Sequence, residues 1–212
     1  MAKRQFLERP ALIHCGDLII DGLYQKGSRD LAAVIAPPLP RDGGSMSSPV
    51  VLELAYALFQ KECHTLRFNF RGVEASTGVI SEEYGAGDED FWAALEFTIE
   101  ATGIPWINAV GYSFGAFIAH RVASRDNRVG KVVMIAPPIT LLDFRPLSSL
   151  SHPLLIITGQ NDPFCPPDQI KPLLESLGKS VTLKIIPQAD HNFLIGLSQV
   201  GKEVGEFIIK KS

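Results

Sequence analysis

Ser113 is the residue in this chain whose setting best suits nucleophilic chemistry. It stands between Gly111 and Gly115, directly after an apolar run that ends at Val110 and directly before a helical run. The pattern G-x-S-x-G between a strand and a helix is typical of a sharp turn that lifts the serine oxygen above a sheet, and its glycines let strand and helix pass closely. The following helix also turns the positive end of its dipole toward the serine. We therefore predict that Ser113 is a nucleophile; the alternative is a Gly-Ser turn that only caps the helix.

A serine hydroxyl is a weak nucleophile at neutral pH and needs a general base. Of the five histidines, His191 is the one that follows a β-prone run, residues 181–186, at its carboxyl end. Ligands of parallel α/β sheets bind outside the carboxyl ends of the strands, so His191 is the candidate base. The remaining histidines are predicted to be structural or surface residues: His14, His64, His120 and His152.

The base needs an acid that fixes its tautomer and stabilises the imidazolium. Asp162 lies just beyond the β-prone run 154–158, and the chain order Ser113, Asp162, His191 is the one that sheets with this serine turn use. Asp162 is therefore the candidate acid, although it could instead be a turn residue that bonds its own backbone. Other acids that could take this place are Asp143, Asp168 and Asp190.

A tetrahedral intermediate at the serine would need two backbone N–H donors. The N–H of Phe114, directly after the nucleophile, is the first candidate. The second should come from the loop after the apolar run 31–35, where three of the next residues are prolines without an N–H. Leu39 is the only possible donor between Ala36 and Arg41, so we predict an oxyanion hole of Phe114 and Leu39. A rigid proline loop without a catalytic part is the alternative.

Short β-prone runs alternate with helical segments along the chain, and many runs are continuously apolar, as strands covered on both faces require. This pattern predicts a mainly parallel, doubly wound α/β sheet with an N-terminal antiparallel hairpin. The hairpin is expected at residues 11–15 and 17–24, and further strands at 31–35, 65–70, 106–110, 129–136, 154–158 and 181–186. Helices are expected at 50–62, with Ser48 as N-cap, at 88–102, with acidic residues in the first turn and Gly103 past the end, and at 116–124, 167–177 and 197–211.

Composition narrows the class of protein. The 212 residues include 46% apolar and 20% charged side chains, which argues against disorder, and a net charge of −3 argues against a nucleic-acid partner. No apolar run approaches the length that spans a bilayer. We therefore expect one domain over residues 1–212 in a cytoplasmic protein without a membrane partner. Its oligomeric state is left open.

The cysteines and motifs give no sign of a cofactor or a metal. Cys15, Cys63 and Cys165 are odd in number and form no CxxC pair, so free thiols are expected in place of disulfides or a thiolate metal site. There is no His-x-x-x-His pattern, which disfavours a metal hydrolase. The first strand-to-helix turn lacks G-x-G-x-x-G, which disfavours a nicotinamide dehydrogenase.

Several motifs between residues 35 and 193 together resemble one known family. Taken in order, they resemble a small α/β-hydrolase, in particular the single-domain, dienelactone-hydrolase-like group of largely uncharacterised bacterial hydrolases. The resemblance implies the α/β-hydrolase fold, a Ser113–His191–Asp162 triad and hydrolysis of carboxylic esters. The segments that carry it are residues 43–46, 66–73, 111–116, 136–138, 159–162 and 189–193.

Two positions depart from the pattern of this group. The loop with the second N–H donor usually begins with histidine, in an H-P-x-P pattern, where this chain has Pro37. The missing histidine puts the stiffness of the Leu39 donor in question. The group also usually has glycine where Glu74 stands. Glu74 is either a solvated loop charge or a charge that disfavours anionic substrates.

The interval of residues 137–153 is too short for a cap domain, so an open cleft is expected. An open, partly apolar cleft suits small esters, and we predict a serine carboxylesterase that works through an acyl-enzyme and needs no cofactor. An acyl transferase or a peptidase with the same triad, or a non-catalytic binding protein on this fold, remain alternatives. Predicted substrate-binding walls are Tyr112, Ile139, Phe164 and Phe193, and further candidate walls are Phe114, Leu141, Leu142 and Phe144.

Overall fold

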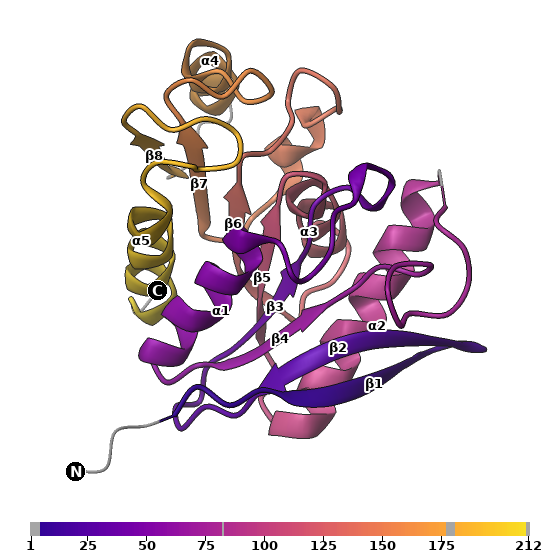
Figure 1. Cartoon of the computed structure of the whole chain (residues 1–212). Helices are drawn as coiled ribbons and strands as arrows, with labels where there is room; N and C mark the ends of the chain where they lie inside the picture. The colour runs from indigo at the N-terminus through magenta and orange to yellow at the C-terminus, as the bar shows by residue number, and fades with distance from the viewer. Residues whose placement is uncertain (1–4, 82, 177–180, 211–212) are drawn as a thin grey trace.

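The computed structural model describes residues 5–81, 83–176 and 181–210, which form one eight-stranded sheet with helices on both sides (Figure 1). The strand order is β1-β2-β4-β3-β5-β6-β7-β8. β1 pairs with β2 and β2 with β4 in the antiparallel sense, and every other pair is parallel. The mainly parallel sheet with an antiparallel hairpin at its edge was correctly predicted. The strands are β1 Arg9–Cys15, β2 Leu18–Gln25, β3 Ala32–Ala36, β4 His64–Phe68, β5 Ile107–Tyr112, β6 Val129–Ile135, β7 Leu154–Gly159 and β8 Val181–Ile186.

The helices form one layer on each face of the sheet (Figure 1). α1 (Pro49–Gln60) and α5 (Leu197–Ile209) pack on one face, while α2 (Tyr84–Thr102), α3 (Phe114–Ala123) and α4 (Pro167–Ser176) pack on the other. This arrangement explains the continuous apolar runs, because a strand covered on both sides buries all of its side chains.

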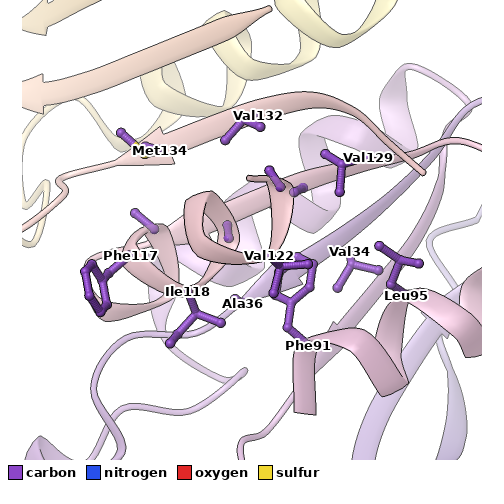
Figure 2. Packing of buried hydrophobic residues seen from close by; sticks show 14 of the residues in the cluster. Val34, Ala36, Phe91, Leu95, Phe117, Ile118, Val122, Val129, Val132 and Met134 are labelled. Carbon is purple, nitrogen blue, oxygen red and sulfur yellow. The ribbon is translucent and has the colours of Figure 1, made fainter. Parts of the chain in front are cut away.

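The central strands show this burial directly, since every residue of β3 and β5 is buried. Val34 faces the layer of α2 and α3, and its neighbour Ile35 faces the layer of α1 and α5. Each large apolar side chain buried in this way stabilises the fold by about 1.5–3 kcal/mol. Figure 2 shows the first of these clusters, in which Phe91 and Leu95 of α2 and Phe117, Ile118 and Val122 of α3 lie over Val34, Val132 and Met134 of the sheet.

The start of α2 differs from the prediction. The helix begins at Tyr84, so Asp88 and Asp90 fall after its first turn and do not serve the helix dipole as expected. Both carboxylates are buried and form ion pairs: Asp88 with Arg121 of α3 and with Arg125 just after α3, and Asp90 with Arg71 at 2.8 Å. Gly103 ends the helix as predicted, with the positive φ of 70° that favours glycine there.

The N-terminus of α1 also lacks a predicted feature. Ser48 occupies the N-cap position before Pro49, but its side chain makes no capping hydrogen bond. Pro49 at the first helical position has the φ that a helix needs and no N–H to leave unsatisfied. The preceding loop contains the short 3₁₀ helix η1 (Pro40–Asp42).

The segment between β6 and β7 consists of turns and the 3₁₀ helix η2 (Arg145–Ser149), with no cap over the carboxyl edge of the sheet. Within the described ranges, no helix has the length and apolar character needed to cross a bilayer. Cys15, Cys63 and Cys165 are free, as predicted. Burial raises the pKa of Cys63 and of Cys165 to about 12, so both stay protonated and are poor nucleophiles at neutral pH.

Candidate active site

The turn between β5 and α3 holds Ser113 in a conformation that side-chain-bearing residues rarely adopt. Its φ is 54° and its ψ is −117°, a strained combination that costs about 1–3 kcal/mol and is typical of functional sites. A Cβ atom on Gly111 would collide with the backbone of Gly115, and a Cβ atom on Gly115 would collide with the carbonyl oxygen of Ala36. Both glycines of the motif are therefore required by the close passage of β5, α3 and the end of β3.

Three loops at the carboxyl edge of the sheet bring Ser113, His191 and Asp162 together. His191 Nε2 lies 3.0 Å from Ser113 Oγ, and His191 Nδ1 lies 2.9 Å from Asp162 Oδ2 and 3.0 Å from Oδ1. Ser113 is half-buried and lines a cavity, whereas Asp162 is only 2% exposed. This hydrogen-bonded line can carry a proton from the serine to the imidazole and stabilise the resulting imidazolium by the buried carboxylate.

The Asp162 carboxylate is held in place by its own turn. Its Oδ1 accepts the backbone N–H of Phe164 at 2.8 Å and that of Cys165 at 3.1 Å. The turn interpretation and the acid interpretation of Asp162 are thus compatible, because the turn bonds aim the carboxylate at the His191 ring.

The other acids that were considered are engaged elsewhere. Asp143 is exposed and pairs with Arg145 at 2.7 Å, and Asp190 Oδ1 accepts the backbone N–H of Leu194 at 3.1 Å. Asp168 lies in the first turn of α4. Asp162 is the acid that lies against the His191 ring.

Two aromatic residues fix the position of His191. The ring of Phe164 meets the imidazole edge to face with 4.9 Å between centroids. The Tyr112 hydroxyl donates to the carbonyl oxygen of His191 and to Asn192 Oδ1, both at 3.2 Å. Burial, together with the carboxylates of Asp162 and Asp190, raises the pKa of Tyr112, so it remains a neutral donor.

The other histidines lie away from this line. His14 is exposed on β1, and His64 Nδ1 lies 2.7 Å from the Tyr24 hydroxyl on the far end of β4. His120 is buried in α3, and His152 precedes β7. None of these four lines the cavity above Ser113.

The loop of residues 37–48, which we call the oxyanion loop, lies beside the nucleophile. Leu39 and Phe114 both line the cavity that contains Ser113 and His191. Across the part of the chain that the structure describes, the N–H groups of Leu39 and Phe114 donate to no other residue. Neither N–H group is therefore held by a competing hydrogen bond, as a donor to an oxyanion would require.

The cavity has a volume of about 1020 Å³ and opens at the carboxyl edge of the sheet. Three of the four predicted walls, Tyr112, Phe164 and Phe193, line it. Ile139 is not part of the lining and packs against the buried core instead, so the geometry gives no support to its predicted role as a wall. Phe144 is likewise a core residue, 3% exposed, whereas Phe114, Leu141 and Leu142 line the cavity.

One wall of the cavity was missed in the sequence. Ile80, Tyr84 and Gly87 come from the segment that enters α2, which was expected to become helical only at Asp88. Phe70 follows the carboxyl end of β4 in the sequence. Because ligands bind beyond the carboxyl ends of parallel strands, this position could have identified Phe70 as a candidate wall. Tyr84 gave no such signal, since it follows no strand.

The cationic side chain of Arg71 near this wall is paired with acidic neighbours. Arg71 lines the cavity, but its Nε lies 2.9 Å from Asp90 Oδ1 and its Nη2 lies 2.8 Å from Glu89 Oε2. Glu74 does not line the cavity; its Oε2 accepts a hydrogen bond from Asn69 Nδ2 at 2.8 Å. The geometry therefore gives no support to a role of Glu74 in rejecting anionic substrates. Among the residues described, no three His, Cys, Asp or Glu side chains gather as they would around a metal ion.

Comparison with known proteins identifies the family. The profile of the alpha/beta hydrolase fold family matches residues 42–150. An uncharacterized protein of Rickettsia prowazekii (strain Madrid E) is 30% identical in an alignment of 202 positions that covers 90% of this chain and 84% of that protein. The chain belongs to the alpha/beta hydrolase fold family, and this membership supports a hydrolase.

Solved structures agree with this assignment. An alpha-beta serine hydrolase homologue from Coxiella burnetii has a TM-score of 0.87 and 28% identity, covering 96% of this chain and 99% of that one. A serine hydrolase without lid from Xanthomonas campestris has a TM-score of 0.85 and 24% identity, covering 99% and 100% of the two chains. These similarities support the resemblance to the dienelactone-hydrolase-like group.

Proposed function

We propose that this protein is a serine carboxylesterase that cleaves small neutral esters through an acyl-enzyme. The observation that carries the proposal is the line of hydrogen bonds from Ser113 Oγ through His191 to Asp162, at 3.0 Å and 2.9 Å, with Ser113 and His191 lining an open cavity. The serine hydrolase homologue from Coxiella burnetii supports the same chemistry.

Acylation would follow from this geometry. Ser113 Oγ attacks the ester carbonyl carbon while His191 Nε2 takes the hydroxyl proton, and the Asp162 carboxylate stabilises the imidazolium. The carbonyl oxygen becomes an oxyanion that accepts hydrogen bonds from the N–H groups of Leu39 and Phe114. The carbon–oxygen bond to the alcohol then breaks, and His191 gives its proton to the leaving alkoxide.

Deacylation would repeat these steps with water. His191 takes a proton from a water molecule that attacks the acyl carbon, and it returns this proton to Ser113 Oγ as the acid leaves. The cavity is open because no cap covers it, so water has direct access to the acyl-enzyme. This access favours hydrolysis over transfer of the acyl group to another alcohol.

The cavity walls support a neutral, apolar substrate. Phe70, Tyr84 and Phe114 provide aromatic surface on one side of Ser113, with Leu194 and Leu197 also in the lining. The cationic side chain of Arg71 is paired with acidic neighbours and does not offer a free site for a substrate anion.

The test compares Ser113→Ala with the unmodified protein on p-nitrophenyl acetate and butyrate. We expect kcat/KM to fall at least about 10³-fold, because the nucleophile is lost while the fold remains. A fluorophosphonate should label the unmodified protein at Ser113 and leave the variant unlabelled. Ser124→Ala, at the other end of α3, is the matched control and should keep its activity.

Unchanged ester turnover in Ser113→Ala would overturn the proposal. Analysis of the products in the presence of a second alcohol distinguishes a hydrolase from an acyl transferase, since a transferase forms the new ester in preference to the free acid.

A further inference from the structure

We propose that Arg67 and Asn69 are positioning residues that hold the oxyanion loop by binding both polar groups of one residue, Met46. The inference rests on the proposed function, in which Leu39 of the same loop donates to the oxyanion. Arg67 lies near the end of β4 and Asn69 just beyond it, and neither residue lines the cavity. Their effect on the reaction would therefore pass through the loop.

The contacts to Met46 form a clamp on its backbone. Arg67 Nη1 donates to the carbonyl oxygen of Met46 at 2.6 Å, and the N–H of Met46 donates to Asn69 Oδ1 at 2.7 Å. All three residues are buried, with exposed fractions of 6% for Arg67, 0% for Asn69 and 5% for Met46. Water cannot replace these bonds, so losing either one leaves a buried polar group without a partner.

One acidic side chain from another segment, Glu8, fixes the arginine side of the clamp. The Arg67 guanidinium also binds Glu8 through two bonds, Nε to Oε1 at 2.7 Å and Nη2 to Oε2 at 2.6 Å. A guanidinium held through two parallel bonds has one orientation. Its remaining Nη1 is thereby aimed at the Met46 carbonyl.

The asparagine side is fixed in the same manner. Asn69 Nδ2 donates to Glu74 Oε2 at 2.8 Å and to Asp21 Oδ2 at 3.3 Å. Two carboxylates on the amide nitrogen leave the amide oxygen facing Met46, where it can accept the backbone N–H.

The clamp is connected to the proposed oxyanion donor by two tight turns. The carbonyl oxygen of Leu39 accepts the N–H of Gly44 at 3.0 Å and that of Asp42 at 3.2 Å. A Cβ atom on Gly44 would collide with the carbonyl groups of Pro38 and Leu39, so this part of the loop is packed backbone to backbone. A shift of Met46 would move Gly44, and Gly44 would move the peptide that contains the Leu39 N–H.

This network accounts for both departures noted in the sequence. Pro37 stands where the resembling group has a histidine, and the clamp supplies the stiffness that was in question. Glu74 has a φ of 50°, the left-handed region that favours glycine, and its strain is compensated by the bond to the buried Asn69. We therefore assign Glu74 a role in supporting the oxyanion loop through Asn69, and no role in substrate selection.

The central experiment uses Glu74→Gly, because glycine relieves the strained φ while removing the carboxylate. If Glu74 only stabilised the fold, Glu74→Gly would lower the activity and the stability of the protein together. The clamp instead predicts that Tm stays the same or rises while kcat for p-nitrophenyl butyrate falls about threefold or more, with KM unchanged. Glu74→Gln keeps an acceptor for Asn69 and should recover part of the lost kcat.

Asn69→Ala breaks the clamp itself, and its kcat should fall about 10-fold or more, short of the 10²–10³-fold that loss of an oxyanion donor costs. A short alkyl trifluoromethyl ketone, which forms a hemiketal oxyanion on the serine, should bind more weakly by the same factor. The matched control is Asn108→Ala, since Asn108 is also buried and its Nδ2 donates to the carbonyl oxygen of Ala32 at 2.9 Å. Ala32 begins β3, whereas the oxyanion loop follows the other end of this strand. This control should lower Tm and leave both kcat and ketone affinity of the folded protein unchanged.

Unchanged kcat and unchanged ketone affinity in both Glu74→Gly and Asn69→Ala would overturn the clamp. If the unmodified protein shows no ester turnover, the proposed function fails, and hydrogen exchange then tests the clamp separately. Amides of residues 39–48 should exchange faster in Asn69→Ala than in Asn108→Ala, and equal exchange in the two variants would reject it.

Discussion

Asp162 Oδ1 accepts two backbone N–H groups of its own turn while the same carboxylate faces the ring of His191. The sequence left a turn residue and an orienting acid as alternatives, and the geometry makes them one arrangement. Residues of this kind can be predicted because chemistry restricts their type and the end of a strand restricts their place. Ile139 could not be assigned in this way, because apolar residues after a strand serve the core and the cavity equally well.

His120 is a residue whose environment makes the stability of the protein depend on pH. Its Nδ1 lies 2.8 Å from the carbonyl oxygen of Phe117, and its ring packs against Phe117 and Phe144. Burial lowers the pKa of His120 from 6.5 to about 4, so the unfolded chain binds a proton more readily than the folded one. The stabilisation is therefore complete above about pH 6.5 and is lost as the pH falls toward 4.

Urea unfolding at pH 7.0 and pH 4.5 measures this contribution. We expect the unmodified protein to lose about 2 kcal/mol more than His120→Gln between these two pH values. His14→Gln changes an exposed histidine and should follow the unmodified protein. Parallel curves for the unmodified protein and His120→Gln would contradict the prediction.

At the scale of elements, α2 and α3 are joined by a buried ion pair. Asp88 of α2 is 1% exposed on its side chain and lies 2.6 Å from Nη2 of Arg121 in α3 and 2.8 Å from Nη1 of Arg125, which follows α3. Asp88→Ala would leave the Arg121 guanidinium half-buried without its partner. We expect the free energy of unfolding to fall by about 3–5 kcal/mol.

Urea unfolding at neutral pH tests this expectation against a matched surface pair. Glu96 of α2 pairs with Arg128 at 3.2 Å, but its side chain is 60% exposed. Glu96→Ala should cost no more than about 1 kcal/mol, because water and salt screen an exposed pair. Equal losses of unfolding free energy in the two variants would show that the buried Asp88 pair stabilises the fold no more than the exposed Glu96 pair does.

Most elements could be predicted because strands buried on both faces leave continuous apolar runs. The early start of α2 could not, since Gly85 and Gly87 lower helix propensity. Gly87 is nevertheless helical, and a Cβ atom there would come within 2.9 Å of Ile118, so the close packing of α2 on α3 decides the conformation. The clamp on Met46 was equally beyond prediction, because hydrogen bonds between distant polar side chains leave no periodic pattern.

At the scale of the whole molecule, no cap formed by the described residues covers the cavity, so on the proposed function its rim is where a substrate would enter. Tyr84 is 43% exposed at this rim and packs against Phe114 and Phe117, with centroid distances of 6.2 Å and 5.0 Å. Tyr84→Ala should lower kcat/KM for p-nitrophenyl hexanoate about 3- to 10-fold and change that for the acetate little. The reason is that a longer chain loses apolar contact worth about 1 kcal/mol.

Steady-state kinetics on the two esters measures the effect. Tyr56→Ala is the matched control, because Tyr56 is 47% exposed on α1 and packs against Phe6 and Phe59, away from the cavity lining. If Tyr84→Ala changed kcat/KM equally for the acetate and the hexanoate, the acyl chain would not contact Tyr84.

The order of the reactive groups along the chain has a consequence for synthesis in the cell. Ser113 leaves the ribosome well before His191, which follows 78 residues later and belongs to the loop after the edge strand β8. Until that loop docks, the serine turn has no base beside it. On the proposed mechanism, a nascent chain that has folded only around β5 lacks the base for ester attack until the chain through His191 has been made and its loop has docked.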